Sequence, residues 1–253
     1  MTDIKKTKIE NKVYHKSVLV EEVIKYLAPQ PGGVYVDCTF GGGGHTRAIL
    51  EAEPKCKVIA FDWDKVAIEK NSEALLEEFG DRLQIVWGNF SHIYYLLRDL
   101  GIKEVDGILA DFGTSQHQIT DSAGFSFSRD TLLDMRMSTS HGQKTAYWYV
   151  NRATESELIS IFSDYGQERY SRRIARAICD YRQSKDIKTT LDLAEIIKRS
   201  VPPSFTSKIH PATRVFQALR IVVNKELDHI RTLLLQSVNT LADNGRIVCI
   251  SFH

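Results

Sequence analysis

The 253-residue chain predicts an α/β protein with a parallel sheet that is interrupted by an all-helical insertion. Short apolar runs alternate with helix-type periodicity in the first half of the chain, and such alternation implies parallel strands joined by right-handed crossovers. From about residue 119 to residue 211 there is no strong strand signal. A strand pattern returns near the end of the chain, so we expect the sheet to resume there.

The individual elements follow from apolar periodicity and from the residues that start and stop each segment. Five strands are expected, ending at or near Asp37, Asp62, Trp87, Asp111 and Phe252. Helices are expected over residues 17–27, 68–79, 91–100 and 154–166, from about 167, over 189–201 and, as one long helix, over 212–234. The expected N-caps include Ser17, Ser91 and Thr154, the last of which forms a capping box with Glu157.

The most informative stretch is the run of four glycines, Gly41 to Gly44, that follows the first strand. Glycine lets the backbone approach a ligand closely and adopt positive φ at little steric cost. Asp62 ends the next strand about 20 residues further on, where an acid can hold a ribose hydroxyl. This combination indicates a nucleoside-bearing cofactor, and the competing interpretation is a simple tight turn.

The kind of cofactor is indicated by what the glycine run lacks. The NAD-type fingerprint requires a third glycine, but the corresponding positions hold Thr46 or Arg47. Asp37, inside the first strand, suits a cationic ligand better than a pyrophosphate. S-adenosylmethionine is cationic at its amino group and its sulfonium, and it is the cofactor that we expect. A dinucleotide-dependent oxidoreductase is the competing class of enzyme, weakened further by the absence of a hydride-transfer constellation.

Other candidate residues lie where the remaining strands end, because ligands of open parallel sheets bind beyond the carboxyl ends of the strands. Phe90 is either an apolar face for an adenine ring or a core side chain. Asp111 either lies beside the transferable group or caps a turn. His45 gains interest from its position next to Gly43 and Gly44, although a histidine at a helix start is more often satisfied by backbone groups.

Four arginines share one helix face, at positions i, i+3, i+4 and i+7: Arg169, Arg172, Arg173 and Arg176. Such a stripe is a candidate surface for phosphate contacts. The competing interpretation is a solvated face, in which Glu168 pairs with Arg172 and Asp180 pairs with Arg176.

The composition limits the classes of protein that need to be considered. The formal net charge is +1, so any nucleic-acid site must be a local patch. The four cysteines lack C-x-x-C spacing, which favours buried, reduced thiols and a cytoplasmic location. No apolar run is long enough to span a bilayer, and no histidines and acids cluster at metal-ligand spacing. The lysine-bearing start of the chain is typical of a frayed tail rather than of a signal or transit peptide.

Several longer motifs are more specific than the glycine turn. They are Tyr14-His-Lys-Ser-Val-Leu19, Asp37-Cys-Thr-Phe-Gly-Gly-Gly-Gly-His45, Val105-Asp-Gly-Ile-Leu-Ala-Asp111, Gly124-Phe-Ser-Phe127, Leu133-Asp-Met-Arg-Met137, Tyr165-Gly-Gln-Glu-Arg169, Arg173-Ile-Ala-Arg-Ala-Ile178, His210-Pro-Ala-Thr-Arg-Val-Phe-Gln-Ala-Leu-Arg220 and Ile250-Ser-Phe-His253. Together they resemble the MraW family, the small-subunit ribosomal RNA cytosine-N4 methyltransferases. The resemblance extends from about Tyr14 to the last residue.

The resemblance implies a Rossmann-like class I methyltransferase fold with S-adenosylmethionine as its cofactor. It implies a methyltransferase core formed by residues 1–118 and 212–253, and an RNA-recognition insertion formed by residues 119–211. The implied substrate is a cytidine in the decoding region of small-subunit ribosomal RNA, and Asp111 is the expected catalytic residue. The family's cofactor contacts carry over to Gly43, Gly44, His45, Asp62, Phe90, Asp111 and Gln118.

The chain departs from the family pattern in two loops and at its end. The family usually has Gly-Val-Ser-Ser-Pro-Gln and Asp-Gly-Pro-Leu-Asp, where this chain has Gly113-Thr-Ser-Gln-His-Gln118 and Asp130-Thr-Leu-Leu-Asp134. The family also continues beyond the position of His253 with a helix and a strand pair that close the sheet. We therefore expect the fifth strand to be an exposed edge unless a partner covers it. The alternative function is a non-catalytic ribosome-assembly or RNA-binding protein that keeps the cofactor fold.

Overall fold

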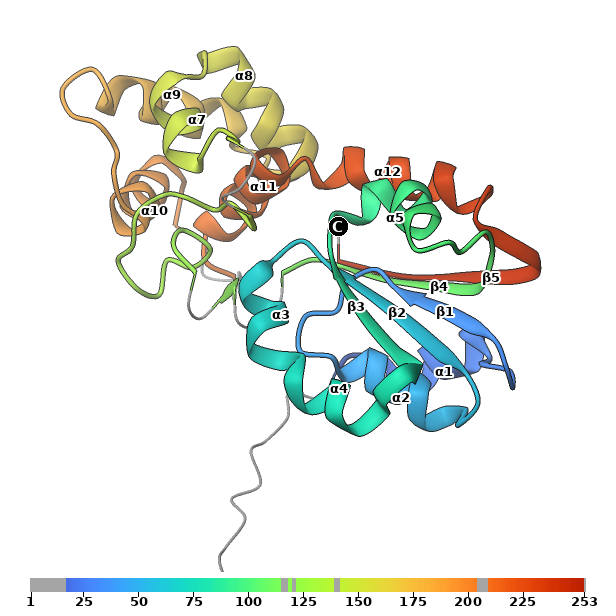
Figure 1. Ribbon diagram of the computed structural model, residues 1–253. Helices are drawn as coiled ribbons and strands as arrows, with labels where there is room; N and C mark the ends of the chain where they lie inside the picture. Colours follow the sequence, from blue (N-terminus) through green and yellow to red (C-terminus); the bar gives the residue numbers. More distant parts are fainter. Residues whose placement is uncertain (1–16, 115–117, 120–121, 139–141, 204–208, 253) are drawn as a thin grey trace, which may run out of the picture.

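A computed structural model describes residues 17–114, 118–119, 122–138, 142–203 and 209–252 (Figure 1). Its centre is a five-stranded parallel sheet in the order β3-β2-β1-β4-β5. The strands are β1 (Val34–Asp37), β2 (Lys57–Asp62), β3 (Leu83–Trp87), β4 (Val105–Phe112) and β5 (Leu241–Ser251). This order reverses the direction of winding between β1 and β4, and such a switch point is where parallel sheets bind ligands. The expected Rossmann-like α/β fold is confirmed.

Helices cover both faces of the sheet, because each strand sends alternate side chains to opposite sides. Tyr35 of β1 packs on the face covered by α1 (Val20–Leu27), α2 (Gly44–Ala52), α3 (Lys65–Asn71) and α4 (Glu73–Phe79). Its neighbour Val36 packs on the opposite face, which α5 (Ile93–Asp99) and α12 (Glu226–Ser237) cover. Strands β1 and β2 thus lie between two helical layers (Figure 1).

A second hydrophobic core is formed mainly by helices, with Leu133, Met135 and Ile187 added from the connecting segments. These helices, called here the helical part, are α7 (Ala146–Arg152), α8 (Glu155–Ser160), the π-helical η3 (Ile161–Tyr165), α9 (Ser171–Tyr181), α10 (Thr190–Ser200) and α11 (Ala212–Asn224). Phe162 lies at the centre of this core and is fully buried. In Figure 1 the helical part stands on the side of the sheet toward which the carboxyl ends of the strands point.

The prediction of one continuous helix over residues 212–234 is wrong, because Lys225 has a left-handed backbone (φ 49°) and separates two helices. The physical reason is that the two halves pack in different cores: Phe216 of α11 belongs to the helical part, whereas Leu233 of α12 belongs to the sheet. Arg220 and Glu226 span the break with paired hydrogen bonds of 2.7 and 2.9 Å. The chain therefore passes from the core of the helical part to the core of the sheet at Lys225. The domain boundary expected between residues 211 and 212 stays a prediction.

Two of the expected helix caps are wrong and one is confirmed. Helix α1 begins at Val20 after Leu19 in a left-handed conformation, without a side-chain cap from Ser17. Asn89, rather than Ser91, caps the segment after β3: its side chain accepts the backbone N–H of Ser91 and starts the 3-10 turn η2 (Phe90–His92). The capping box of Thr154 and Glu157 is present at α8.

Strand β5 lies at an edge of the sheet and pairs with β4. The register between these two strands shifts between Val105 and Gly107. Cys249 of β5 is exposed, whereas Cys38 and Cys56 are buried, so the expectation of buried thiols holds for only part of the set. Within the described ranges, no helix is both long and apolar enough to cross a bilayer.

Candidate cofactor site at the strand ends

The glycine run forms a turn between β1 and α2 that only glycine accommodates at its third position. Gly43 has a φ of +76°, and a Cβ there would lie 2.3 Å from Cδ1 of Leu75. Its N–H donates to the carbonyl of Phe40 at 2.7 Å, which closes the turn. A Cβ at Gly42 would meet nothing within 4 Å. The turn is therefore packed on one side and open on the other, and α2 begins at Gly44 without a side-chain cap.

Asp37 is used inside this turn and is not presented to a ligand. Its side chain is fully buried and accepts the hydroxyl of Thr46 at 2.7 Å and the backbone N–H of Thr39 at 3.0 Å. Burial raises the pKa of Asp37, and the hydrogen bond from Thr46 opposes that shift. Asp37 thus holds the end of β1 against the start of α2, which corrects the expectation that it faces a cationic ligand.

Asp62 connects the tip of β2 to the glycine turn. Its Oδ2 accepts the N–H of Gly41 at 2.7 Å, and its Oδ1 accepts the N–H of Asp64 at 2.8 Å. Burial raises the pKa of Asp62 to about 6, although both N–H donors lower it. Each carboxylate oxygen has two acceptor positions, so Asp62 retains capacity to accept hydroxyl groups.

Asp111 lies near the end of β4, next to the central strand. Its N–H donates to the hydroxyl of Thr39 at 2.9 Å, and its side chain is partly exposed. No hydrogen bond or ion pair engages its carboxylate within the part of the chain that the structure describes. Burial raises the pKa of Asp111, the nearby His45 lowers it, and Asp37 raises it further. The arrangement leaves a carboxylate at the switch point available to a substrate.

His45 lies at the start of α2, and its ring is already engaged. Its Nε2 lies 2.8 Å from the carbonyl oxygen of Val18, and the side chain is buried. A backbone carbonyl satisfies the ring, as the competing interpretation of this histidine expects. His45 thus connects α2 with the segment before α1.

Gln118 lies in the short described segment 118–119 and is buried. Its Nε2 donates to Oδ2 of Asp64 at 3.3 Å, and Oδ1 of Asp64 caps α3 by accepting from Val66 and Ala67. Because the N–H of Asp64 binds Asp62, Gln118 is connected to the tip of β2.

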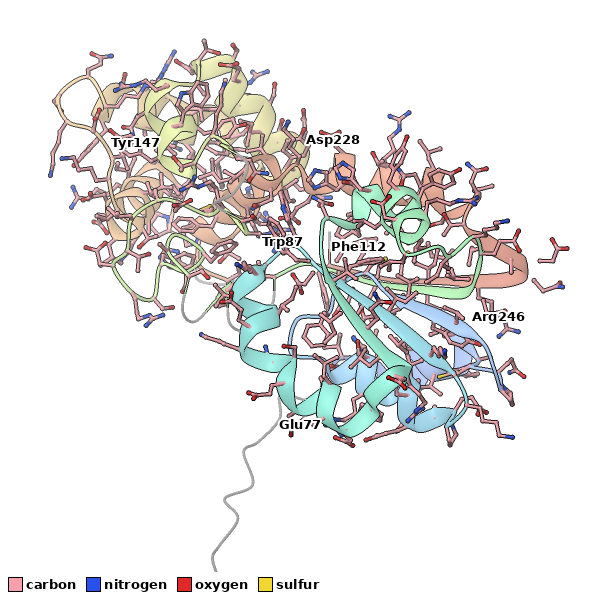
Figure 2. The ribbon with its side chains drawn as sticks, viewed as in Figure 1. Glu77, Trp87, Phe112, Tyr147, Asp228 and Arg246 are labelled. Atoms are coloured by element: carbon pink, nitrogen blue, oxygen red, sulfur yellow. The ribbon has the colours of Figure 1, made fainter. Side chains whose placement is uncertain are left out.

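Aromatic side chains gather where β2, β3 and β4 end. The ring of Phe90 lies 5.7 Å from that of Phe112, and His229 of α12 lies 5.2 Å from the ring of Trp63. Figure 2 shows Trp87 and Phe112 on the side of the sheet nearest the helical part, with Asp228 of α12 beyond them. This apolar surface neighbours Asp62, whose carboxylate faces the glycine turn.

The structure brings six of the seven predicted residues to the ends of β1 to β4, to the turns that follow or to the start of α2, and it places Gln118 beside Asp64. Sequence reasoning missed Trp63, Asn89 and His229. Trp63 had a signal, since it directly follows Asp62 at a strand end. His229 had none, because it lies 140 residues from its partner Asn89.

The arginine stripe is exposed to solvent, as its competing interpretation expects, but the ion pairs expected there are absent from the described residues, and Arg169 precedes α9 instead of lying on it. Arg172 and Arg173 are exposed, and neither has an ion-pair partner in the described residues. Glu168 is instead buried, with Oε1 accepting the N–H of Tyr170. Arg176 approaches Glu155 of α8 at 4.0 Å rather than Asp180. Of this face, Arg172 and Arg173 therefore carry positive charge without an ion-pair partner among the described residues.

Comparisons with known proteins find sequence relatives over nearly the whole chain. The model of the MraW methylase family matches residues 12–253. The ribosomal RNA small subunit methyltransferase H of Syntrophotalea carbinolica is 49% identical over 242 residues, which are 94% of this chain and 76% of that protein. The protein of the same name from Sulfurihydrogenibium azorense is 45% identical and matches 95% of this chain and 82% of its own length.

Overlap with solved structures is partial. An rRNA methylase from Streptococcus thermophilus is 18% identical with a TM-score of 0.31, covering 41% of this chain and 57% of that one. The identification thus rests on the matches in sequence, which cover nearly the whole chain. The chain belongs to the MraW methylase family and is an S-adenosylmethionine-dependent methyltransferase.

Proposed function

We propose that the protein methylates the exocyclic N4 of a cytidine in the decoding region of small-subunit ribosomal RNA. The names of the curated relatives support ribosomal RNA of the small subunit as the substrate. The resemblance of the longer motifs to cytosine-N4 methyltransferases supports the atom and the region. The single observation that carries the chemistry is the carboxylate of Asp111 at the switch point of the sheet, which no hydrogen bond or ion pair engages among the described residues.

The residues at the strand ends fit S-adenosylmethionine. The open side of Gly42 admits a ligand against the backbone, and the tightly packed Gly43 holds that backbone in shape. Asp62 would accept the ribose hydroxyls, and Phe90 would pack against the adenine ring. Gly43, Gly44 and His45 at the start of α2, together with Asp111 and Gln118, complete the proposed cofactor contacts. When bound, this cofactor supplies an electrophilic methyl group on a sulfonium.

Asp111 would act on the nucleophile. The lone pair of a cytosine amino group is delocalised into the ring, so the nitrogen attacks poorly unless it is held in line with the methyl group. A carboxylate that accepts an N–H bond localises this lone pair and takes up the proton that the nitrogen loses once the N–C bond has formed. Alignment by itself lowers the barrier by roughly 7–11 kcal/mol. The pKa of Asp111, raised by burial, favours its role as proton acceptor.

No covalent adduct with the base is required. Carbon methylation of pyrimidines uses a thiolate, but the thiol that directly follows β1, Cys38, is buried. Burial raises the pKa of Cys38 well above its usual value, with Asp37 as a second cause. A neutral, enclosed thiol does not serve as a nucleophile, and direct transfer to nitrogen remains the mechanism that the site supports.

RNA recognition is assigned to the insertion, residues 119–211, as part of the same proposal. A base must leave its stack to reach a strand-end pocket, at a cost of a few kcal/mol. Contacts to phosphates offset that cost, and the exposed Arg172 and Arg173 on α9 supply charge for them. Because small ribosomal subunits are the substrate, the proposed location is the cytoplasm.

The test is transfer of labelled methyl from S-adenosylmethionine to small subunits that lack the modification, followed by nucleoside analysis. N4-methylcytidine is the expected product. Asp111→Asn should lose at least about 100-fold in the rate of transfer while binding the cofactor as before. Glu77→Gln removes an exposed charge on α4, away from the strand ends in Figure 2, and should leave the rate unchanged. Full activity of Asp111→Asn would refute its role, and bound cofactor without transfer would indicate a binding protein.

A further inference from the structure

The side chain of Asn89 joins the tip of β3 to helix α12. Its Oδ1 accepts the N–H of Ser91 at 2.9 Å, which caps the turn that carries Phe90. Its Nδ2 lies 3.2 Å from Nδ1 of His229, which is 140 residues further along the chain. Asn89 is buried, whereas His229 is partly exposed, so the contact with Ser91 is enclosed and the contact with His229 is partly buried. The position of the Phe90 turn therefore depends on a residue of α12.

These contacts determine the protonation state that His229 must have. Since Oδ1 of Asn89 is the acceptor for Ser91, the atom that faces His229 is the amide nitrogen, which only donates. Nδ1 of His229 must then accept, and the ring carries its proton on Nε2. A protonated imidazole would place two donors opposite each other, so the contact requires the neutral form.

The imidazole also packs between two aromatic residues of the strand ends. Its ring lies 5.2 Å from Trp63 at an interplanar angle of 77°, and 6.4 Å from Phe90 at 88°. Perpendicular ring pairs of this kind are attractive. Trp63 follows Asp62 directly, so His229 touches the residues on both sides of the proposed adenosine position.

The surroundings favour the neutral ring. Burial is the largest effect and lowers the pKa of His229, and His92 of η2 and Lys225 at the helix break lower it as well. Asp228 and Glu226 of α12 act in the opposite direction. The neutral state that the geometry requires is thus the one that this environment stabilises at neutral pH.

We propose that His229 is a positioning residue for cofactor binding, which holds Asn89, and through it Phe90, only while its imidazole is neutral. The inference rests on the proposed role of Phe90 at the adenine ring. It adds a residue from α12, which directly follows the helical part, to the control of the cofactor site. Cofactor affinity should therefore fall on acidification below the ordinary histidine pKa of about 6.5.

The experiment measures binding of S-adenosylhomocysteine to the full chain by calorimetry, at about pH 7.5 and about pH 5.5. His229→Ala removes the acceptor and should weaken binding roughly tenfold at the higher pH, because the Asn89 amide is left without its partner. His229→Asn places an amide oxygen where Nδ1 was and should bind like the wild type at the higher pH. The loss of affinity on acidification should be smaller in His229→Asn than in the wild type, because asparagine does not titrate.

Each outcome bears on the proposal. Rescue by His229→Asn together with a reduced pH dependence supports it. Wild-type affinity in His229→Ala, or equal weakening and an unchanged pH dependence in both variants, would show that the ring only fills space. Should His229→Ala fail to fold, the pH dependence of His229→Asn alone decides between these results. Absence of binding in the wild type would instead overturn the proposed cofactor site.

Discussion

Replacing Gly43 with alanine should destabilise the protein more than the same replacement at Gly32. Both glycines have positive φ, +76° and +81°. A left-handed backbone costs a residue with a Cβ about 1–2 kcal/mol at either position. At Gly43 the new Cβ would also lie 2.3 Å from Cδ1 of Leu75 and 3.0 Å from the ring of Phe40, whereas at Gly32 it meets nothing within 4 Å.

The expected losses of stability differ between the two variants. Overpacking of a filled core adds roughly 1–3 kcal/mol, so Gly43→Ala should lose about 2–5 kcal/mol and Gly32→Ala about 1–2 kcal/mol. Total stabilities of about 5–15 kcal/mol make both losses measurable by urea unfolding at constant m-value. Cofactor affinity should fall only in Gly43→Ala, because Gly32 precedes β1 and lies outside the turn. Equal losses of stability would refute the reasoning and show that Leu75 simply moves aside.

Three further predictions test other parts of the molecule. Cofactor affinity should decline as the pH falls through about 6, because protonation of Asp62 removes the acceptor for the ribose hydroxyls. Stability of the free protein should respond in the opposite direction, because the pKa of Asp62 is raised from 3.8 to about 6 on folding. Asp62 therefore favours folding by at most about 3 kcal/mol at low pH, and this contribution is lost as the pH rises through 6. Calorimetry on the His229→Asn variant measures the contribution of Asp62 to cofactor binding without that of His229. A cofactor affinity that does not change with pH in this variant would contradict the prediction. Thr154→Ala removes the capping box of α8 and should lower the free energy of unfolding by about 1 kcal/mol, with unchanged cofactor binding. Denaturant unfolding measures this loss, and an unchanged free energy of unfolding would mean that α8 does not need the cap. The double variant Arg172→Glu, Arg173→Glu should bind ribosomal RNA more weakly. The slope of its log affinity against log salt concentration should fall by the amount expected for roughly two lost phosphate contacts. An unaltered slope would mean that the RNA binds another surface.

The parallel sheet and the strand-end acids were predictable because their signals are local. Asp62 and Asp111 end apolar runs of strand length, and the glycine run marks the turn after the first strand. The cap of the segment after β3 was mispredicted because Asn89 and Ser91 are both good capping residues only two positions apart. The break at Lys225 was missed because the apolar periodicity continues on both sides of it.

The amino-acid sequence by itself determined the order of the strands along the chain, the glycine turn and the family, since these depend on neighbouring residues and short motifs. Only the tertiary structure decided which acids are available. It encloses Asp37 between Thr46 and Thr39, engages Asp62 with backbone N–H groups, and leaves the carboxylate of Asp111 without a partner in the described residues. It also brought His229 to Asn89 across 140 residues. Burial and long-range contacts set the charge state of each group, and neither is encoded in local spacing.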